Sequence, residues 1–421
     1  MNAVAAHLPP GSFADDPAVA RILDLLSSEG DAAYVVGGAV RNALLGLQPG
    51  DIDIATTAEP PIVVAKAQAA GLRSIPTGIE HGTVTVLIDH RPFEVTTLRR
   101  DVETYGRRAT VSFSRDIGED AQRRDFTMNA LYARADGAVL DPVGGLPDLH
   151  ARRVRFIGDA RTRIREDYLR ILRLFRFHAE YGEGPLDPQA RDAAVALRGG
   201  LERLSAERIR AEWLKLLAAR RAAEVVPAVA EAGFAQQVLG GVARLAPFAR
   251  LLAGCPAATP IARLAALALH GSHDVQRLRD RLRLSGAEAQ ALEQAGLLID
   301  RLHGRAAALD VPGARRLVHE LGSAEARNAL CVAMVADGLD VAQSLAAVAP
   351  GLDAPRPRSP WSGAHLIARG VPPGPGMGAI LAAAEAAWRD EGFPDDAVRQ
   401  NEILDDILER RAGEEPPSTR P

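Results

Sequence analysis

The pattern of hydrophobic and polar positions divides the chain into two parts. In the first part, short runs rich in β-branched residues, such as 82–88 and 92–98, predict strands of a sheet. His90-Arg91 between these two runs favours a hairpin. From Asp159 onward, apolar residues recur at helical spacing, with Gly or Pro at the breaks. The pattern therefore predicts an α+β fold, in which a small α/β head precedes a long all-α remainder.

Other segments of the head carry weaker signals. An apolar repeat predicts a helix from Pro17 to Ser28, and residues 1–16 lack such a repeat, so we expect a loose leader there. Residues 118–130 predict a further helix, followed by a short strand. Before this helix, residues 103–114 are polar with little periodicity, which predicts a mobile loop.

The stretch 34–57 combines apolar strands with residues suited to chemistry. Its order predicts a strand, a tight glycine turn, a short helix and a second strand that holds Asp51 and Asp53. Residues two apart on a strand share a face, so the two carboxylates are expected side by side. Hard anionic oxygen ligands suit Mg²⁺. We therefore predict two Mg²⁺ ions roughly 3.5–4 Å apart, one activating an attacking hydroxyl and one neutralising a leaving pyrophosphate.

The glycine turn, Gly37-Gly38, is the second half of this constellation. Glycines after a strand let backbone N–H groups approach a phosphate, and the following helix, which carries Arg41, offers its positive end. A Gly-Gly pair and an Asp-x-Asp pair are each common alone. Together within one supersecondary unit they predict metal-assisted attack at a nucleotide phosphate.

A third carboxylate lies on the second run of the predicted hairpin. Phe93, Val95 and Thr97 are expected to share one face of this strand, which leaves Glu94 on the other. If the strand lies beside 52–54, Glu94 reaches the aspartate pair. The alternative, which the residues alone favour, is a solvent-facing glutamate.

Composition and charge limit the function classes. The chain has 421 residues, enough for about two to four domains, and a formal net charge of −4, which does not by itself indicate a nucleic-acid partner. However, residues 152–176 hold nine arginines against three acids, the local footprint of a polyanion partner. The alternative is a solvated helix face.

Cysteine usage and hydropathy point to the cell interior. Cys255 and Cys331 fit neither a disulfide framework nor a zinc spacing, and their apolar surroundings predict burial. No run of about 18 apolar residues exists, so we expect no membrane span. The first residues lack a signal-peptide pattern. We therefore expect a soluble cytoplasmic protein.

The motifs resemble those of a known family. The runs GGAVRNALLG and GDIDIATTA resemble the head motif of class II nucleotidyltransferases, the family of tRNA CCA-adding enzymes and poly(A) polymerases. HGTVTV and FEVTTLR, EDAQRRDFTMNALYA, DPVGGLPDL and REDYLRILRLFRF resemble its further motifs in the same order. The resemblance implies a polymerase-β-like head with a small mixed sheet (17–150), a helical neck with the nucleotide-recognition helix (151–220), a helical body (221–351) and a helical tail (352–421).

The resemblance also implies roles for residues at matching positions. Asp51 and Asp53 are expected to bind the metals and, with Glu94 as third carboxylate, to form the catalytic set. The nucleotide-binding set that it implies is Gly37, Gly38, Arg41, Arg124, Asp167, Arg170, Arg173 and Arg176. The family usually has Asp where Asn42 stands, and we expect this departure to have little effect on metal binding.

The recognition helix explains how a protein could choose bases. Asp167 and Arg170 are three apart, hence neighbours on a helix surface. Asp167 accepts from the exocyclic amine of cytosine or adenine while Arg170 donates to the adjacent ring nitrogen. Uracil and guanine present the opposite pattern, and each buried polar group left unpaired costs about 1–3 kcal/mol. The alternative is that the acids and arginines here are only ion pairs on the helix surface.

Three functions are compatible with these residues. The first is template-independent addition of C, C and A to the tRNA 3′ end from CTP and ATP. The second is a poly(A) polymerase of the same family, and the third is a non-catalytic RNA-binding protein, against which the intact Asp51 and Asp53 argue. Complete CCA addition, CC-only addition and A-only addition all stay open.

Overall fold

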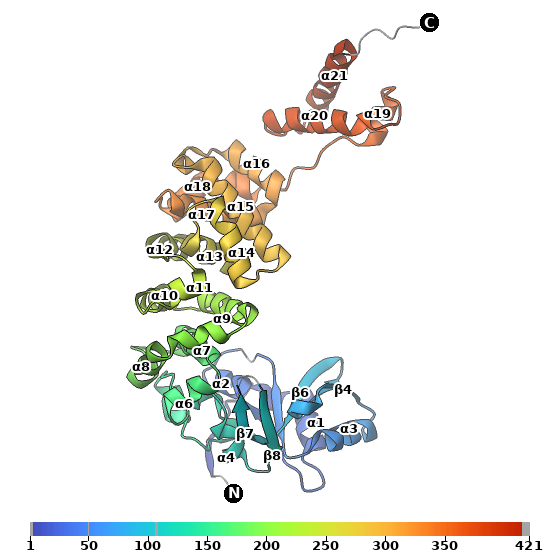
Figure 1. Cartoon of the computed structure of the whole chain (residues 1–421). Coiled ribbons are helices and arrows are strands. Elements are labelled where there is room, and N and C mark those ends of the chain that lie inside the picture. The colour runs from blue at the N-terminus through green and yellow to red at the C-terminus, as the bar shows by residue number, and fades with distance from the viewer. Residues whose placement is uncertain (1–2, 49, 106–107, 415–421) are drawn as a thin grey trace. The chain divides into compact units, whose positions relative to one another are not determined.

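The computed structural model describes residues 3–48, 50–105 and 108–414. Its contacts divide the chain into two compact units, residues 1–238 and residues 239–421 (Figure 1). The finer division into head, neck, body and tail stays a prediction.

A mixed β-sheet forms the first half of unit 1. Within the described residues it has eight strands: β1 (Val4–His7), β2 (Ala33–Val36), β3 (Asp53–Thr56), β4 (Arg73–Gly78), β5 (Thr83–Ile88), β6 (Arg91–Thr97), β9 (Tyr132–Ala133) and β10 (Ala138–Leu140). Their spatial order is β1-β10-β9-β2-β3-β6-β5-β4. β3 and β6 are parallel, and the other neighbours are antiparallel.

The helices of unit 1 flank the sheet and then follow it in the chain. They are α1 (Pro17–Leu26), α2 (Gly38–Leu44), α3 (Pro60–Ala69), α4 (Ile117–Gln122), α5 (Leu146–His150), α6 (Ala160–Glu166), α7 (Leu169–Tyr181), α8 (Pro188–Ala196), α9 (Ala206–Ala218) and α10 (Ala222–Glu231), with short 3₁₀ turns at η1 (Phe13–Asp15), η2 (Ile79–His81), η3 (Thr127–Asn129) and η4 (Arg198–Arg203). α1 and α3 pack together beside the sheet, and α7 packs against α9 and α10 (Figure 1). The predicted α+β class is confirmed.

The core of the sheet on the α4 side is continuous. It is built from aliphatic side chains with one buried tyrosine, and its members are Val36, Ala55, Leu98, Ile117, Ala121, Ala130, Tyr132, Leu140 and Ile157. Burying such apolar surface contributes roughly 25 cal/mol per Å². This cluster fixes β2 beside β3 and α4, and so positions the glycine turn and Asp53.

The predicted hairpin and its faces are confirmed. β5 and β6 pair antiparallel, and Phe93, Val95 and Thr97 are buried while Glu94 is exposed. The period of two along the strand decides this pattern, since every second side chain enters the core.

Three predictions for the head are wrong. The first residues are not a loose leader, because β1 pairs with β10 at the sheet edge. Over 103–114, where a loop was predicted, β7 (Arg99–Tyr105) and β8 (Arg108–Phe113) form a two-stranded antiparallel ribbon, and residues 106–107 lie outside the described part. A polar composition does not exclude such a ribbon, since a hairpin satisfies its own backbone hydrogen bonds.

The third error concerns the helix predicted over 118–130. It ends early, with α4, and the chain then becomes extended at Phe126 before η3. The extended segment hydrogen-bonds to a later one: Thr127 N–H donates to the Arg155 carbonyl, and Ile157 N–H donates to the Asp125 carbonyl. A partner distant in sequence therefore overrides the local helical preference.

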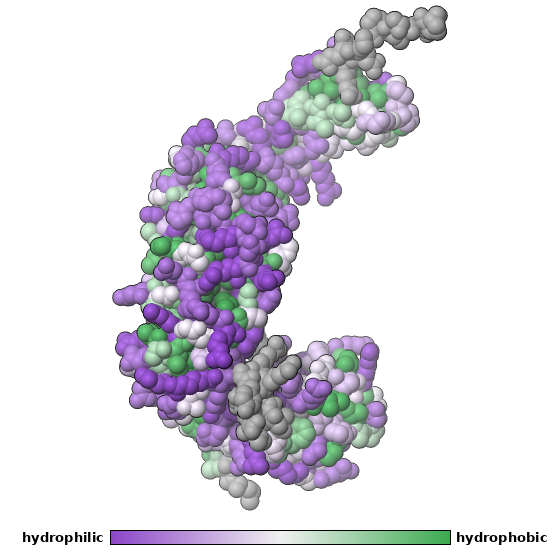
Figure 2. Space-filling view, viewed as in Figure 1, coloured by the Kyte–Doolittle hydropathy of each residue, from purple (hydrophilic) through white to green (hydrophobic). Residues whose placement is uncertain are grey.

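Unit 2 is helical throughout its described residues. Its helices are α12 (Leu245–Gly254), α13 (Pro260–Ala268), α14 (Val275–Leu282), α15 (Gly286–Leu302), α16 (Val311–Leu321), α17 (Ser323–Ala336), α18 (Val341–Asp353), α19 (Gly363–Ala368), α20 (Gly376–Asp390) and α21 (Ala397–Glu414), with 3₁₀ turns at η5 (Ser272–Asp274) and η6 (Ala306–Ala308). α11 (Phe234–Leu239) spans the boundary between the units. Both cysteines are buried, as predicted. Hydrophilic side chains cover most of the helical surface that Figure 2 shows.

Among the described residues, no helix is both long enough and apolar enough to cross a membrane.

Candidate active site

A pocket of about 530 Å³ lies within unit 1, between the glycine turn after β2 and the start of α7. Its lining is strongly basic, with seven arginines against three aspartates. The lining residues are Gly37, Gly38, Arg41, Asp53, Arg123, Arg124, Asp125, Asn129, Asp167, Leu169, Arg170, Arg173, Arg176, Phe177 and Arg208. A concave site with convergent polar groups and an excess of cations suits a polyanionic ligand.

The pocket brings together most of the residues predicted from the sequence. Those that line it are Gly37, Gly38, Arg41, Asp53, Arg124, Asp167, Arg170, Arg173 and Arg176. Asp51 and Glu94 do not line it. Their roles in catalysis and binding stay predictions.

Asp53 and Glu94 lie side by side on neighbouring strands. They are register partners in the parallel pair of β3 and β6, which confirms that Glu94 can reach Asp53. Asp51 lies in a bend before the strand, because β3 begins only at Asp53, so the predicted strand is shorter than expected. Within the described part of the chain, no hydrogen bond or ion pair is made by any of the three carboxylates.

The electrostatics of Asp53 reflect this crowding. Desolvation raises the pKa of Asp53 to about 6, and the charges of Glu94 and then Asp51 add to the rise, while Arg124 opposes it. Like charges that share a site disfavour a second ionisation. A bound cation would relieve the same repulsion, and the oxygen donors fit a hard divalent ion. Among the described residues, however, no three His, Cys, Asp or Glu side chains are already arranged to hold a metal together.

The glycine turn is shaped by Gly37. Its φ of 74° and ψ of −119° lie where side chains are strained, and its N–H donates to the Leu131 carbonyl. A Cβ at Gly37 would lie 3.5 Å from Nη1 of Arg124. Arg124 therefore lies in van der Waals range of the turn.

Arg124 is held by a buried acidic hub. Asp120, which is 1% exposed, accepts hydrogen bonds from Arg123, Arg124 and the hydroxyl of Tyr132. Burial alone would raise the pKa of Asp120, but the two guanidiniums lower it to about 2. The hub keeps Arg124 fixed while one side of it faces the pocket.

Arg41 is engaged more deeply than the sequence indicated. It is 5% exposed, and it donates to Oδ1 of Asn129 at 2.5 Å, to Oδ1 of Asn42 and to the Tyr181 hydroxyl at 2.8 Å. Tyr181 is the last residue of α7. Arg41 therefore connects the helix after the glycine turn to the far end of α7.

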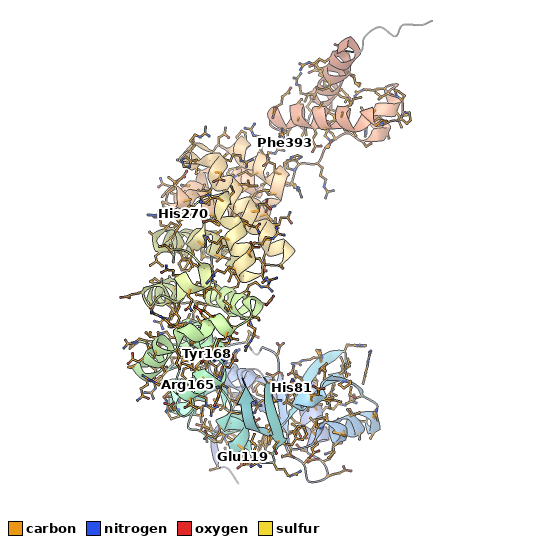
Figure 3. All side chains as sticks on the ribbon, viewed as in Figure 1. His81, Glu119, Arg165, Tyr168, His270 and Phe393 are labelled. Atoms are coloured by element: carbon orange, nitrogen blue, oxygen red, sulfur yellow. The ribbon has the colours of Figure 1, made fainter. Side chains whose placement is uncertain are left out.

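The recognition pair differs from its predicted geometry. Asp167 is not inside a helix, because it caps α6 in an extended conformation, and α7 begins at Leu169. Its Oδ1 accepts from the Leu169 N–H and its Oδ2 from Arg208 at 2.6 Å. Arg165 and Tyr168, close to Asp167 in sequence, are labelled in Figure 3. The junction still places Asp167 and Arg170 in the same pocket.

The arginines of α7 have acidic partners. Arg170 donates to Glu166 and to the Arg123 carbonyl. Arg173 contacts Asp125 at 2.6 Å, and Arg176 contacts Glu212 of α9 at 2.5 Å. Of the ion pairs predicted as an alternative, Arg170–Glu166 is present, whereas Arg173 and Arg176 pair with acids from other segments, and these arginines line a pocket.

Sequence reasoning missed several lining residues. Asp125 and Arg123 lie inside a quoted motif and could have been found there. Phe177 lies one position after Arg176, inside another quoted motif. Arg208 is 41 positions from its partner Asp167, and no sequence signal linked the two.

Two segments of the chain match known family models. Residues 33–155 match the family model described as "Poly A polymerase head domain", and residues 185–245 match "Probable RNA and SrmB- binding site of polymerase A". The crystal structure of Bacillus stearothermophilus CCA-adding enzyme in complex with CTP is similar, with a TM-score of 0.70 and 28% identity over 94% of this chain and 97% of that one. Residues 33–155 and 185–245 thus match domains named after poly(A) polymerases, and the fold of the chain is that of a CCA-adding enzyme.

Curated nucleotidyltransferases are similar to about half of the chain. CCA tRNA nucleotidyltransferase 1, mitochondrial, from Danio rerio is 44% identical over 205 residues, 48% of each chain. The CCA-adding enzyme of Geobacillus thermodenitrificans (strain NG80-2) is 41% identical over 221 residues, 52% of this chain and 54% of the relative. The alignments thus span about half the length of these relatives.

Proposed function

We propose that this protein is a template-independent tRNA nucleotidyltransferase that adds C, C and A to the tRNA 3′ end from CTP and ATP. The observation that carries the proposal is that Asp167 and Arg170, which we propose read the base, line one pocket together with Asp53. The family and the names of its relatives, which are CCA-adding enzymes, support the same reaction.

The metal site of this proposal consists of carboxylates. Asp51 and Asp53 would hold two Mg²⁺ ions, with Glu94 as the third acidic group, and the raised pKa of Asp53 supports a need for positive charge there. When bound, such ions activate the attacking 3′ hydroxyl and neutralise the leaving pyrophosphate. A divalent ion is general in this chemistry, and Mg²⁺ is our specific assignment.

In this proposal, base choice depends on the hydrogen-bond acceptor positions of Asp167 that its existing bonds do not occupy. A carboxylate accepts about four hydrogen bonds, and Asp167 uses two of these positions, for the Leu169 N–H and for Arg208. The amine of cytosine or adenine can use a further one. Arg170, after it releases Glu166, can donate to the ring nitrogen. The remaining arginines, with Gly37 and Gly38, would bind the triphosphate.

The experiment that tests this function uses tRNA lacking its three terminal residues. The full chain is incubated with that tRNA and CTP, with ATP, or with both, and the products are sequenced. The proposal predicts C-C from CTP alone and C-C-A from both nucleotides. Long A tails without C would indicate a poly(A) polymerase, and products from only one of the additions would indicate a CC-only or A-only enzyme.

A binding-only protein is the remaining outcome of the same experiment. If the tRNA binds but no nucleotide is incorporated, and tRNA ending in C-C is not extended with ATP either, the chain is a non-catalytic RNA-binding protein and the catalytic proposal is wrong. A cytoplasmic location also stays a proposal, and the name of one relative places that relative in mitochondria.

A further inference from the structure

We infer that Phe177 and Tyr181 are positioning residues that hold the phosphate-binding arginines of the pocket, an inference that rests on the proposed function. Both lie on α7, four positions apart, so their rings occupy one face of the helix. Neither residue is in the predicted binding set.

The geometry places one aromatic ring at the centre of three guanidiniums. The carbon Cζ of Arg176 lies 4.2 Å from the centre of the Phe177 ring, that of Arg173 at 5.1 Å and that of Arg41 at 5.3 Å. Cations within about 6 Å of an aromatic ring are attracted by its quadrupole. One uncharged side chain thus contacts all three cations.

Tyr181 completes the arrangement from the end of the helix. Its ring centre lies 3.9 Å from Cζ of Arg41, and its hydroxyl accepts a hydrogen bond from Nη2 of Arg41. The rings of Tyr181 and Phe177 lie 5.5 Å apart. Arg41 is therefore held against two rings.

The three arginines need such support because they repel one another. Burial lowers the pKa of Arg41, and the charges of Arg176 and Arg173 lower it further. Asp125 and Glu212 neutralise Arg173 and Arg176 from the other side. Aromatic faces attract cations without adding a negative charge that would repel a phosphate, so the rings can hold the arginines and leave the pocket attractive to anions.

The ring of Phe177 packs in turn against aromatic side chains of unit 1. The Phe177 ring lies 5.1 Å from that of Phe126, which in turn lies 4.9 Å from that of Phe156. Phe126 belongs to the extended segment that follows α4. The position of the guanidiniums is thus set by packing that begins outside the pocket.

This arrangement predicts a specific kinetic effect. The three arginines face phosphates, whereas Asp167 and Arg170 face the base. Loss of the Phe177 ring should therefore weaken binding of CTP and ATP by the same factor and raise both KM values. It should leave the preference for CTP over UTP unchanged.

The first measurement is the binding of inorganic triphosphate and of CTP by calorimetry in EDTA, where the arginines act without metal. The second is the KM values for CTP and ATP in nucleotide addition to tRNA, with metal present. Phe177→Leu keeps an apolar side chain but removes the π face, and we expect both affinities to fall about tenfold. Phe177→Tyr keeps the ring and should restore most of the affinity. Tyr181→Phe keeps its ring but loses the bond to Arg41, so the affinities should fall about fivefold.

The matched control is Phe175→Leu on the same helix. Phe175 is equally buried but packs against Phe234, at 5.0 Å. The Phe175→Leu variant should lower Tm as much as Phe177→Leu does. It should bind triphosphate with the affinity of the wild type. Equal losses of affinity in both variants, or unchanged affinity in Phe177→Leu and Tyr181→Phe, would overturn the inference. Wild-type protein that binds triphosphate in this way but adds no nucleotide would instead contradict the proposed function.

Discussion

At the scale of single residues, the charge of Asp53 is the most informative feature. The pKa of Asp53 is raised to about 6, so its negative charge is poorly compensated by the surrounding groups. Its acidic neighbours, Asp51 before β3 and Glu94 on β6, lack partners among the described residues, whereas every lining arginine of the pocket except Arg41 is paired with another acid. The imbalance suits a site that becomes complete only when a cation binds.

This imbalance predicts how stability depends on pH. The folded-state pKa of Asp53 is raised above its usual 3.8, so ionisation costs stability as the pH rises from about 4 through 6. In EDTA, Asp53→Asn should be about 1 kcal/mol more stable than wild type at pH 8, since partial exposure screens the effect, and the gap should shrink towards pH 5. Thermal unfolding at the two pH values measures it.

Two controls make this measurement specific. Asp24→Asn, at an exposed position on α1, should show no gap that depends on pH. Added Mg²⁺ should raise the Tm of the wild type more than that of Asp53→Asn, because a ligand stabilises only the state that binds it. An equal rise in both proteins would argue against a metal at Asp53.

At the scale of elements, the sequence predicted the strands better than the junctions. The β5–β6 hairpin and the position of Glu94 followed from a period of two, because one face of each strand must be buried. The early end of α4, the place of β1 and the bend at Asp167 depend on partners distant in sequence. Arg155, Leu140 and Arg208 supply those contacts, and no local pattern contains them.

The junction of α6 and α7 gives the next prediction. Arg208 of α9 holds Asp167 at 2.6 Å, so Arg208→Ala should let this carboxylate move away from the base. We expect the ratio of kcat/KM for CTP over UTP to fall about tenfold, which is the effect of one charge-assisted hydrogen bond. Single-nucleotide incorporation on tRNA measures this ratio.

The control for Arg208 is an arginine whose ion pair is exposed. Arg191 on α8 pairs with Asp192 at the surface, and Arg191→Ala should leave the ratio unchanged. A preference for CTP that survives in Arg208→Ala would mean that Asp167 needs no support from α9.

At the scale of the whole molecule, the proposed chemistry is concentrated in unit 1. The pocket and the match to the head-domain model both lie within residues 1–238. The fold class and most lining residues could be predicted from the sequence, because the motifs lie in a fixed order along the chain. The ion-pair partners could not, since they depend on how α7 and α9 pack.

The central claim is that protein side chains alone choose the bases to be added. The most direct test presents tRNA ending at the discriminator base with all four nucleoside triphosphates and sequences the products of the wild type and of Asp167→Ala. We predict C-C-A from the wild type, and from Asp167→Ala slower products with mixed bases at each position. An unchanged C-C-A sequence from Asp167→Ala would contradict the account.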